Sequence, residues 1–256
     1  MKQILITLIA IAVLTSLGVS QNTASSKINS KTVMYKSGNE DVRGIVFRPA
    51  GKANAKLPAI VVIQEWWGLN DWVKQQAEDL ASQGYETLAV DLYRGKVATT
   101  RDEAHELMNG LPPERAMRDL KGAVAYLKSQ PNVNPDKIGA IGWCMGGGYA
   151  AQLAVAEPTL VADVVNYGQL PDSSADASAI KAKMLGNFGG KDQGITPESV
   201  HTFEEQMKAA GNPVDFKIYP DAGHGFQNPV NKSGYNPQAT ADAKKRISDF
   251  FAKTLK

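Results

Sequence analysis

The chain has 256 residues, of which 43% are hydrophobic and 21% are charged, and its 28 basic and 26 acidic residues give a formal net charge of +2. This length and composition predict one large globular domain with a substantial core. The balanced charge, without a basic stripe interleaved with aromatic residues, argues against nucleic-acid binding. The single cysteine excludes an internal disulfide and any metal site built from several cysteines.

Residues 1–25 predict a secretory signal and the start of a linker. A positively charged start precedes the apolar run Ile4–Val13, and small residues place cleavage near Ser20 or Ala24. The alternative is an uncleaved membrane anchor, but the apolar run is short for a membrane span. We therefore expect an exported protein, periplasmic or secreted. After cleavage we expect a monomer without membrane contact, whose single domain covers residues 26–256.

The apolar pattern predicts strands that alternate with helices. A hairpin of residues 32–35 and 44–47 is followed in chain order by a strand at 58–63, a helix at 71–83, a strand at 86–92, a helix at 113–129, a strand at 137–141, a helix from 146, strands at 162–167 and 184–188, a helix at 197–210, a strand at 214–219 and a helix at 239–255. This order predicts an α/β fold with a mostly parallel sheet covered by helices on both faces. In such sheets, functional residues gather at the carboxyl ends of the strands.

The only cysteine lies in the segment Gly142-Trp143-Cys144-Met145-Gly146. Glycines two positions before and after a reactive residue, between a strand and a helix, are typical of a nucleophile elbow. The turn leaves no room for side chains at the glycine positions, and a helix N-terminus favours the thiolate form of the cysteine. An isolated cysteine would more simply be a buried structural thiol. The glycine pattern favours Cys144 as a nucleophile.

A candidate acid and a candidate base follow two later strands. Asp192 comes after strand 184–188, and His224 comes after strand 214–219. His224 would take the thiol proton and later return it to the leaving group, while Asp192 would orient the imidazole and stabilise its charged form. The order nucleophile, acid, base is that of the α/β-hydrolase arrangement. The alternatives are a helix-capping or turn role for Asp192 and a turn role for His224.

The backbone N–H groups of Met145 and Trp66 are candidate oxyanion donors, because Met145 follows the nucleophile and Trp66 follows strand 58–63. His105 and His201 fall in helical stretches away from the strand ends, so we expect both at the surface. With the histidines so dispersed we expect no zinc or other metal site, and no cofactor.

Five segments together resemble the dienelactone hydrolase family of the α/β-hydrolase superfamily. They are residues 64–70 (QEWWGLN), 91–95 (DLYRG), 142–147 (GWCMGG), 190–192 (GKD) and 223–226 (GHGF). The resemblance implies an α/β-hydrolase fold, a Cys144–His224–Asp192 triad and a carboxymethylenebutenolidase-like esterase activity without a cofactor.

The resemblance also implies roles for two further residues. In the family, the glutamate at the position of Glu65 contacts the resting thiol and is displaced when substrate enters. Arg94 matches a family arginine that binds the substrate's carboxylate, which a guanidinium can grip through two parallel hydrogen bonds. The plainer alternatives are a surface acid for Glu65 and a surface ion pair for Arg94.

The chain departs from the family's dienelactone-cleaving members after the histidine. Those members carry a serine and an arginine where this chain has Gly225 and Asn228, which argues against dienelactone itself as the substrate. Trp66, Trp67 and Trp143 would either line a more apolar pocket or pack in the core.

We therefore predict a hydrolase that cleaves a small ester or lactone through a cysteine acyl-enzyme, with a thioesterase or a small peptidase as variants of the same chemistry. A non-catalytic small-molecule binding protein on the same fold is the alternative from another class. A redox sensor is a third interpretation, although the chain has no second cysteine to resolve an oxidised Cys144.

Overall fold

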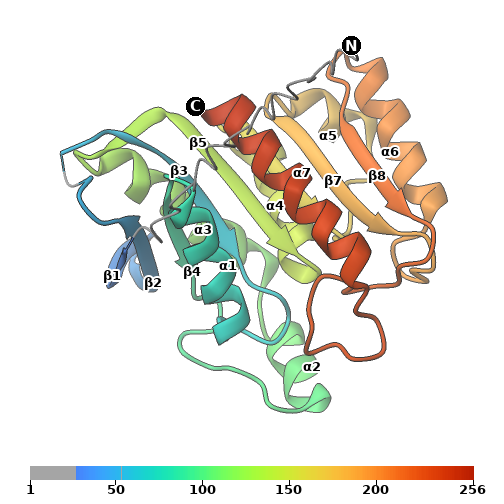
Figure 1. Cartoon of the computed structure of the whole chain (residues 1–256), viewed down its shortest axis with the longest axis horizontal. Helices are drawn as coiled ribbons and strands as arrows, with labels where there is room; N and C mark the ends of the chain where they lie inside the picture. The colour runs from blue at the N-terminus through green and yellow to red at the C-terminus, as the bar shows by residue number, and fades with distance from the viewer. Residues whose placement is uncertain (1–26, 53) are drawn as a thin grey trace, which may run out of the picture.

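The computed structural model describes residues 27–52 and 54–256. The predicted export signal at residues 1–25 lies outside this part. Within it, the strands form one eight-stranded sheet with the order β1-β2-β4-β3-β5-β6-β7-β8 (Figure 1). The strands are β1 (Ile28–Ser37), β2 (Glu40–Pro49), β3 (Leu57–Ile63), β4 (Glu86–Val90), β5 (Val133–Trp143), β6 (Ala162–Asn166), β7 (Lys183–Gly189) and β8 (Asp215–Tyr219). The pairs β1–β2 and β2–β4 are antiparallel and the other five are parallel.

Helices cover both faces of this sheet, as the sequence predicts. They are α1 (Asp71–Ser82), α2 (Arg101–Asn109), α3 (Pro113–Ser129), α4 (Met145–Ala156), α5 (Ser174–Ala179), α6 (Pro197–Ala209) and α7 (Pro237–Leu255). Apolar residues of α1 and α7 pack in one core layer, and those of α3, α4 and α6 pack in the other. Helix α7 crosses one face of the sheet, whereas α2 projects beyond it (Figure 1).

The predicted elements recur with small shifts at their ends. The hairpin turns between Ser37 and Glu40, and α3 has the predicted bounds. Strand β5 begins earlier than predicted, at Val133, because Leu57 of β3 pairs with it there. Helix α5 is absent from the prediction. Its six residues, SADASA, carry no apolar periodicity, and Ser173 caps it through a hydrogen bond from the N–H of Asp176.

Strand β3 is apolar because it lies inside the sheet, between β4 and β5. The last five of its seven residues are buried. Helix α1 begins at a conventional cap, where the Asn70 side chain accepts a hydrogen bond from the N–H of Val73. Past its end, Gly84 has φ +100°, a conformation that other residues rarely adopt.

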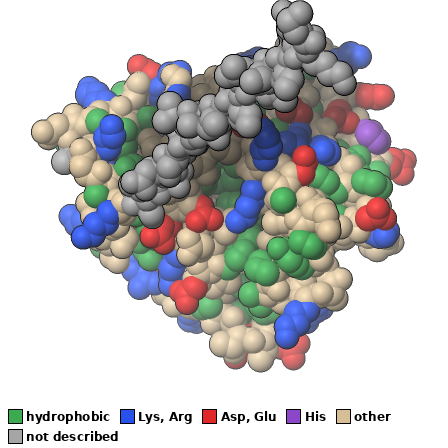
Figure 2. Space-filling model, viewed as in Figure 1, with side chains coloured by type: hydrophobic (Ala, Val, Ile, Leu, Met, Phe, Trp, Pro, Cys, Tyr) green, Lys and Arg blue, Asp and Glu red, His purple; other side chains and the backbone are tan. Residues whose placement is uncertain are grey.

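The parallel strands β5, β7 and β8 end at the same edge of the sheet, which therefore collects Cys144, Asp192 and His224. Basic and acidic side chains are interspersed on the face that Figure 2 shows. No helix in residues 27–52 and 54–256 combines the length and the apolarity that a membrane span requires.

Candidate active site

Cys144 lies at a strained turn between β5 and α4. Its φ of +54° is in the left-handed region, which is uncommon for a residue with a side chain. A Cβ on Gly142 would come within 1.9 Å of the Gly146 carbonyl oxygen, and one on Gly146 would come within 2.4 Å of the Gln64 oxygen. The two glycines therefore allow the backbone to fold back tightly enough to present the sulfur. This is the strand–turn–helix that the glycine spacing predicts.

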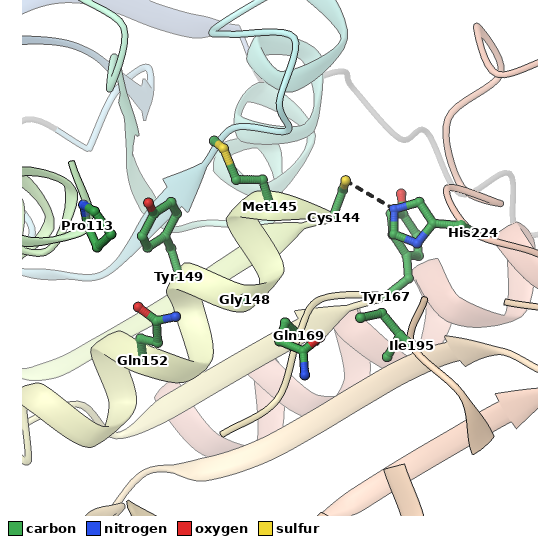
Figure 3. A pocket seen from close by; sticks show the side chains of 10 residues that line it. All are labelled: Pro113, Cys144, Met145, Gly148, Tyr149, Gln152, Tyr167, Gln169, Ile195 and His224. Carbon is green, nitrogen blue, oxygen red and sulfur yellow. Dashed lines mark hydrogen bonds between the residues drawn. The ribbon is translucent and has the colours of Figure 1, made fainter. Parts of the chain in front are cut away.

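The structure brings Cys144, His224 and Asp192 together in a hydrogen-bonded row. His224 Nε2 lies 3.1 Å from Cys144 Sγ (Figure 3). On the other side of the ring, His224 Nδ1 lies 2.7 Å from Asp192 Oδ2. The Asp192 side chain is 2% exposed and that of His224 is 44% exposed. The row thus runs from a buried carboxylate through an accessible imidazole to the thiol.

The loop after β7 holds Asp192 in its charged form. The N–H groups of Gly194 and Ile195 donate to Oδ1 at 2.9 and 3.1 Å, which leaves Oδ2 for His224. Burial opposes ionisation, but the hydrogen bond with His224 and the backbone donors outweigh it and lower the pKa of Asp192. Asp192 therefore accepts a hydrogen bond from the Nδ1–H group of His224, which directs Nε2 toward the sulfur.

The imidazole readily becomes charged in this setting. Burial disfavours the imidazolium, but the hydrogen bonds and charges of Asp192 and Cys144 outweigh burial and raise the pKa of His224 to about 10. The arrangement can therefore hold a thiolate beside an imidazolium, which is the reactive form of a cysteine nucleophile.

Glu65 lies next to this row but makes no hydrogen bond to the thiol. It is 3% exposed, and its two oxygens accept from Asn228 Nδ2 at 2.7 Å and from the Tyr167 hydroxyl at 3.4 Å. Burial raises the pKa of Glu65 to about 7, although Asn228, His224 and Tyr167 favour the charged form. In this structure the sulfur lies within hydrogen-bonding distance of His224 Nε2, and the glutamate is engaged by Asn228 and Tyr167.

The candidate oxyanion donor Met145 is the first residue of α4, and the candidate Trp66 follows β3, whose last carbonyl group lies against Gly146. Neither the N–H of Met145 nor that of Trp66 donates to an acceptor in the described part of the chain. Met145 lines the cavity described below. The Trp66 ring packs edge-on against Trp67, with centroids 5.0 Å apart, and against the exposed His105 at 4.8 Å. The oxyanion role of these two N–H groups stays a prediction.

The guanidinium of Arg94 is engaged in ion pairs. It donates to both oxygens of the fully buried Asp119, at 2.6 and 3.1 Å, and to Glu40 at 3.0 Å. The cavity beside Cys144 is lined by other residues. The role that the resemblance implies for Arg94, binding a substrate carboxylate, stays a prediction.

A cavity of about 280 Å³ opens beside the sulfur (Figure 3). Its wall consists of Pro113, Cys144, Met145, Gly148, Tyr149, Gln152, Tyr167, Gln169, Ile195 and His224. The sequence does not predict most of this wall, because the lining residues belong to separate segments that only the folded sheet brings together. One usable signal was the helical spacing of Cys144, Gly148 and Gln152, which places them along one side of α4.

The described residues contain no group of three or more His, Cys, Asp or Glu side chains that could hold a metal ion. His201 is exposed on α6, where its Nδ1 lies 2.8 Å from Glu204, and His105 is exposed on α2. Both histidines are at the surface, as predicted from their helical settings.

Comparison with known proteins places this geometry in a family. The model of the dienelactone hydrolase family matches residues 42–255. A protein of Methylorubrum extorquens named "Putative carboxymethylenebutenolidase" is 33% identical over 219 residues, which cover 80% of this chain and 75% of that protein.

Solved structures of dienelactone hydrolases and related proteins have a similar fold. A dienelactone hydrolase-like promiscuous phosphotriesterase from metagenomic libraries superposes with a TM-score of 0.80 at 26% identity, covering 90% of this chain and 99% of the other. The dienelactone hydrolase of Anabaena variabilis, at 22% identity and a TM-score of 0.67, covers 90% of this chain and 99% of its own and shares the fold. The chain belongs to the dienelactone hydrolase family and has the α/β-hydrolase fold.

Proposed function

We propose that the protein hydrolyses a small ester or lactone, with Cys144 as the nucleophile and a thioester acyl-enzyme as the intermediate. One observation carries the proposal: an imidazole nitrogen lies 3.1 Å from the only sulfur nucleophile, while its other nitrogen is bonded to a buried carboxylate. A nucleophile, a base and a group that orients the base are the parts that covalent acyl transfer requires.

In the first half of the reaction, Cys144 Sγ attacks the acyl carbonyl carbon, and the thiol proton resides on His224 Nε2. The carbonyl oxygen gains negative charge in the tetrahedral intermediate, and the N–H groups of Met145 and Trp66 donate hydrogen bonds to it. The intermediate collapses when the carbon–oxygen bond to the alcohol breaks. His224 gives its proton to the departing oxygen, and a thioester remains on Cys144.

In the second half, water attacks the thioester carbon while His224 Nε2 takes a proton from it. The carbon–sulfur bond breaks, the acid is released, and the proton returns to the sulfur–imidazole pair. For a lactone the alcohol and the acid belong to one molecule, so a single ring-opened hydroxy acid leaves the site.

Glu65 supports the charged state of this pair. An ionised carboxylate near His224 favours the imidazolium through its field in a buried site. Because the pKa of Glu65 is about 7, this support increases as the pH passes through neutrality.

Parallel assays of p-nitrophenyl esters, lactones and thioesters with the wild-type protein and Cys144→Ala test the proposal. We expect turnover of at least one activated ester by the wild type and its loss in Cys144→Ala. Full activity in Cys144→Ala would end the proposal. The lactone and thioester arms show which acyl compounds the cavity accepts.

A further inference from the structure

A buried side chain, Gln227, ties the loop that carries His224 to β5, the strand that ends directly before Cys144. Gln227 is 2% exposed and follows the histidine by three residues. Its Oε1 accepts a hydrogen bond from Trp143 Nε1 at 3.1 Å, and its Nε2 donates to Asn166 Oδ1 at 2.8 Å. An indole nitrogen only donates, so the orientation of the Gln227 amide is determined by its partners.

Asn166, at the end of β6, in turn holds the backbone on both sides of the nucleophile. Its carbonyl oxygen accepts from the N–H of Cys144 at 3.0 Å, and its side-chain Nδ2 donates to the carbonyl oxygen of Gly142 at 3.1 Å. Gln227 therefore connects the histidine loop to the elbow by two routes, through the Trp143 side chain and through Asn166.

The same cluster reaches the strand that precedes Asp192. Asn187 of β7 donates its Nδ2 to Asn166 Oδ1 at 2.9 Å, and its carbonyl oxygen accepts from the N–H of Tyr167 at 2.8 Å. The three segments that deliver the nucleophile, the acid and the base thus meet in one set of buried amides, Asn166, Asn187 and Gln227, beneath the site.

Such a cluster resists movement because each shift leaves a buried polar group unpaired, at a cost of about 1–3 kcal/mol per group. The imidazole needs this restraint because the His224 side chain is 44% exposed. Proton transfer in turn depends strongly on distance, and a displacement of about 1 Å can cost roughly 10²-fold in rate.

We propose that Gln227 is a positioning residue that keeps the His224 imidazole within hydrogen-bonding distance of Cys144 Sγ. It contacts neither the sulfur nor the cavity, and it acts through Trp143 and Asn166. The importance of Gln227 for catalysis rests on the proposed function. Its effect on the distance between the His224 imidazole and Cys144 Sγ can be tested without turnover.

The test measures the rate at which iodoacetamide alkylates the folded protein between pH 5 and 10, followed by intact mass. A thiol paired with an imidazole reacts at lower pH than an unpaired one. Gln227→Met keeps the length of the side chain but removes both hydrogen bonds. We expect it to slow alkylation at pH 7 by about tenfold and to move the rise in rate to higher pH by about one unit.

Thr240→Val is the matched control. The Thr240 hydroxyl donates to the carbonyl oxygens of Phe226, in the same loop, and of Asn236, at 2.9 and 2.7 Å, and neither of these partners belongs to the elbow. We expect Thr240→Val to lower the melting temperature and to leave the alkylation profile unchanged. Gln227→Glu, which keeps an acceptor for Trp143, should give a profile between those of the wild type and Gln227→Met, and it serves as the test variant if Gln227→Met does not fold.

A wild-type profile in a folded Gln227 variant, or equal shifts in the Gln227 and Thr240 variants, would overturn the inference and leave Gln227 with a purely structural role. A wild-type protein that shows the predicted alkylation profile but hydrolyses none of the esters would instead contradict the proposed function alone.

Discussion

Asn228 donates its side-chain Nδ2 to Glu65 Oε2 at 2.7 Å and thereby holds a buried carboxylate beside His224 without adding a positive charge. The orientation of this amide is fixed, because Asn228 Oδ1 accepts from the N–H of Val230 at 3.0 Å. A neutral donor favours the carboxylate less than an arginine would. Glu65 therefore ionises near neutral pH instead of remaining charged throughout.

This pairing predicts the pH dependence of the reaction. The titratable groups that face Glu65 are His224 and Tyr167, and an ionised Glu65 favours the imidazolium form of His224. We therefore expect kcat/KM to rise with pH through about 7 in the wild type. Asn228→Ala removes a donor that lowers the pKa of Glu65, so this rise should move to higher pH by about one unit.

Glu65→Gln should remove the same rise. Val230→Ala, a change at a 75% exposed position of the same loop, should leave it in place. The measurement is kcat/KM for one activated ester between pH 5 and 9. If the rise persists unchanged in Glu65→Gln, another group is responsible for it.

The elbow glycines make a second prediction. A Cβ at position 142 would lie 1.9 Å from the Gly146 oxygen, whereas one at position 223 would meet nothing within 4 Å. Gly142→Ala should therefore distort the turn and abolish both thiol alkylation and ester turnover. Gly223→Ala, although adjacent to His224, should retain near-wild-type activity. Circular dichroism and both assays compare the two variants, and normal activity in Gly142→Ala would refute the close approach.

A third prediction concerns Asp163, a fully buried carboxyl in β6 that plays no part in the mechanism. Its oxygens form no hydrogen bond of normal geometry with the described residues. Burial raises the pKa of Asp163 to about 8, and the N–H of Val164 offsets this only in part. The carboxyl is therefore protonated in the folded protein at neutral pH.

The pH dependence of stability follows from this. An aspartic acid in the unfolded chain loses its proton near pH 3.9, well below the folded pKa. Stability consequently falls as the pH rises from about 4 to about 8, by up to about 1.4 kcal/mol per unit, and levels off above that range. Asp163→Asn should abolish this contribution. Urea unfolding at pH 5 and pH 8 should show a gain over the wild type that is larger at pH 8, and an equal or smaller gain at pH 8 would contradict the assignment.

Arg94 gives a fourth prediction. Its hydrogen bonds to Asp119 and Glu40 raise the pKa of its guanidinium, with the Asp119 bond as the largest cause. Arg94→Gln would leave the buried Asp119 carboxylate without its bidentate partner, so we expect a loss of stability of about 2–3 kcal/mol. KM for an uncharged ester should stay within about twofold of the wild type.

Thermal unfolding and steady-state kinetics with a neutral and a carboxylate-bearing ester separate the two roles of this arginine. A rise in KM confined to the carboxylate ester would support the substrate-binding role that the family resemblance implies. An unchanged melting temperature would contradict the structural role of the ion pairs.

The sequence predicts the fold and the meeting of Cys144, His224 and Asp192 because both leave local signals. Alternation of apolar runs marked the strands, and glycines around Cys144 and His224 marked tight turns next to functional side chains. The contacts that tune the site left no such signal. Neighbouring residues do not predict the contacts of Asn228 and Gln227, because their partners Glu65, Trp143 and Asn166 lie 163, 84 and 61 positions away in the chain.

The proposed reaction depends on the acylation of Cys144 during turnover. Rapid mixing with a p-nitrophenyl ester, followed by acid quenching and intact-mass measurement, tests this most directly. We predict a burst of p-nitrophenol no larger than one equivalent per protein and a matching mass increase of one acyl group, located on the peptide that carries Cys144. Hydrolysis with neither a burst nor an adduct on that peptide, and at an undiminished rate in Cys144→Ala, would contradict the account.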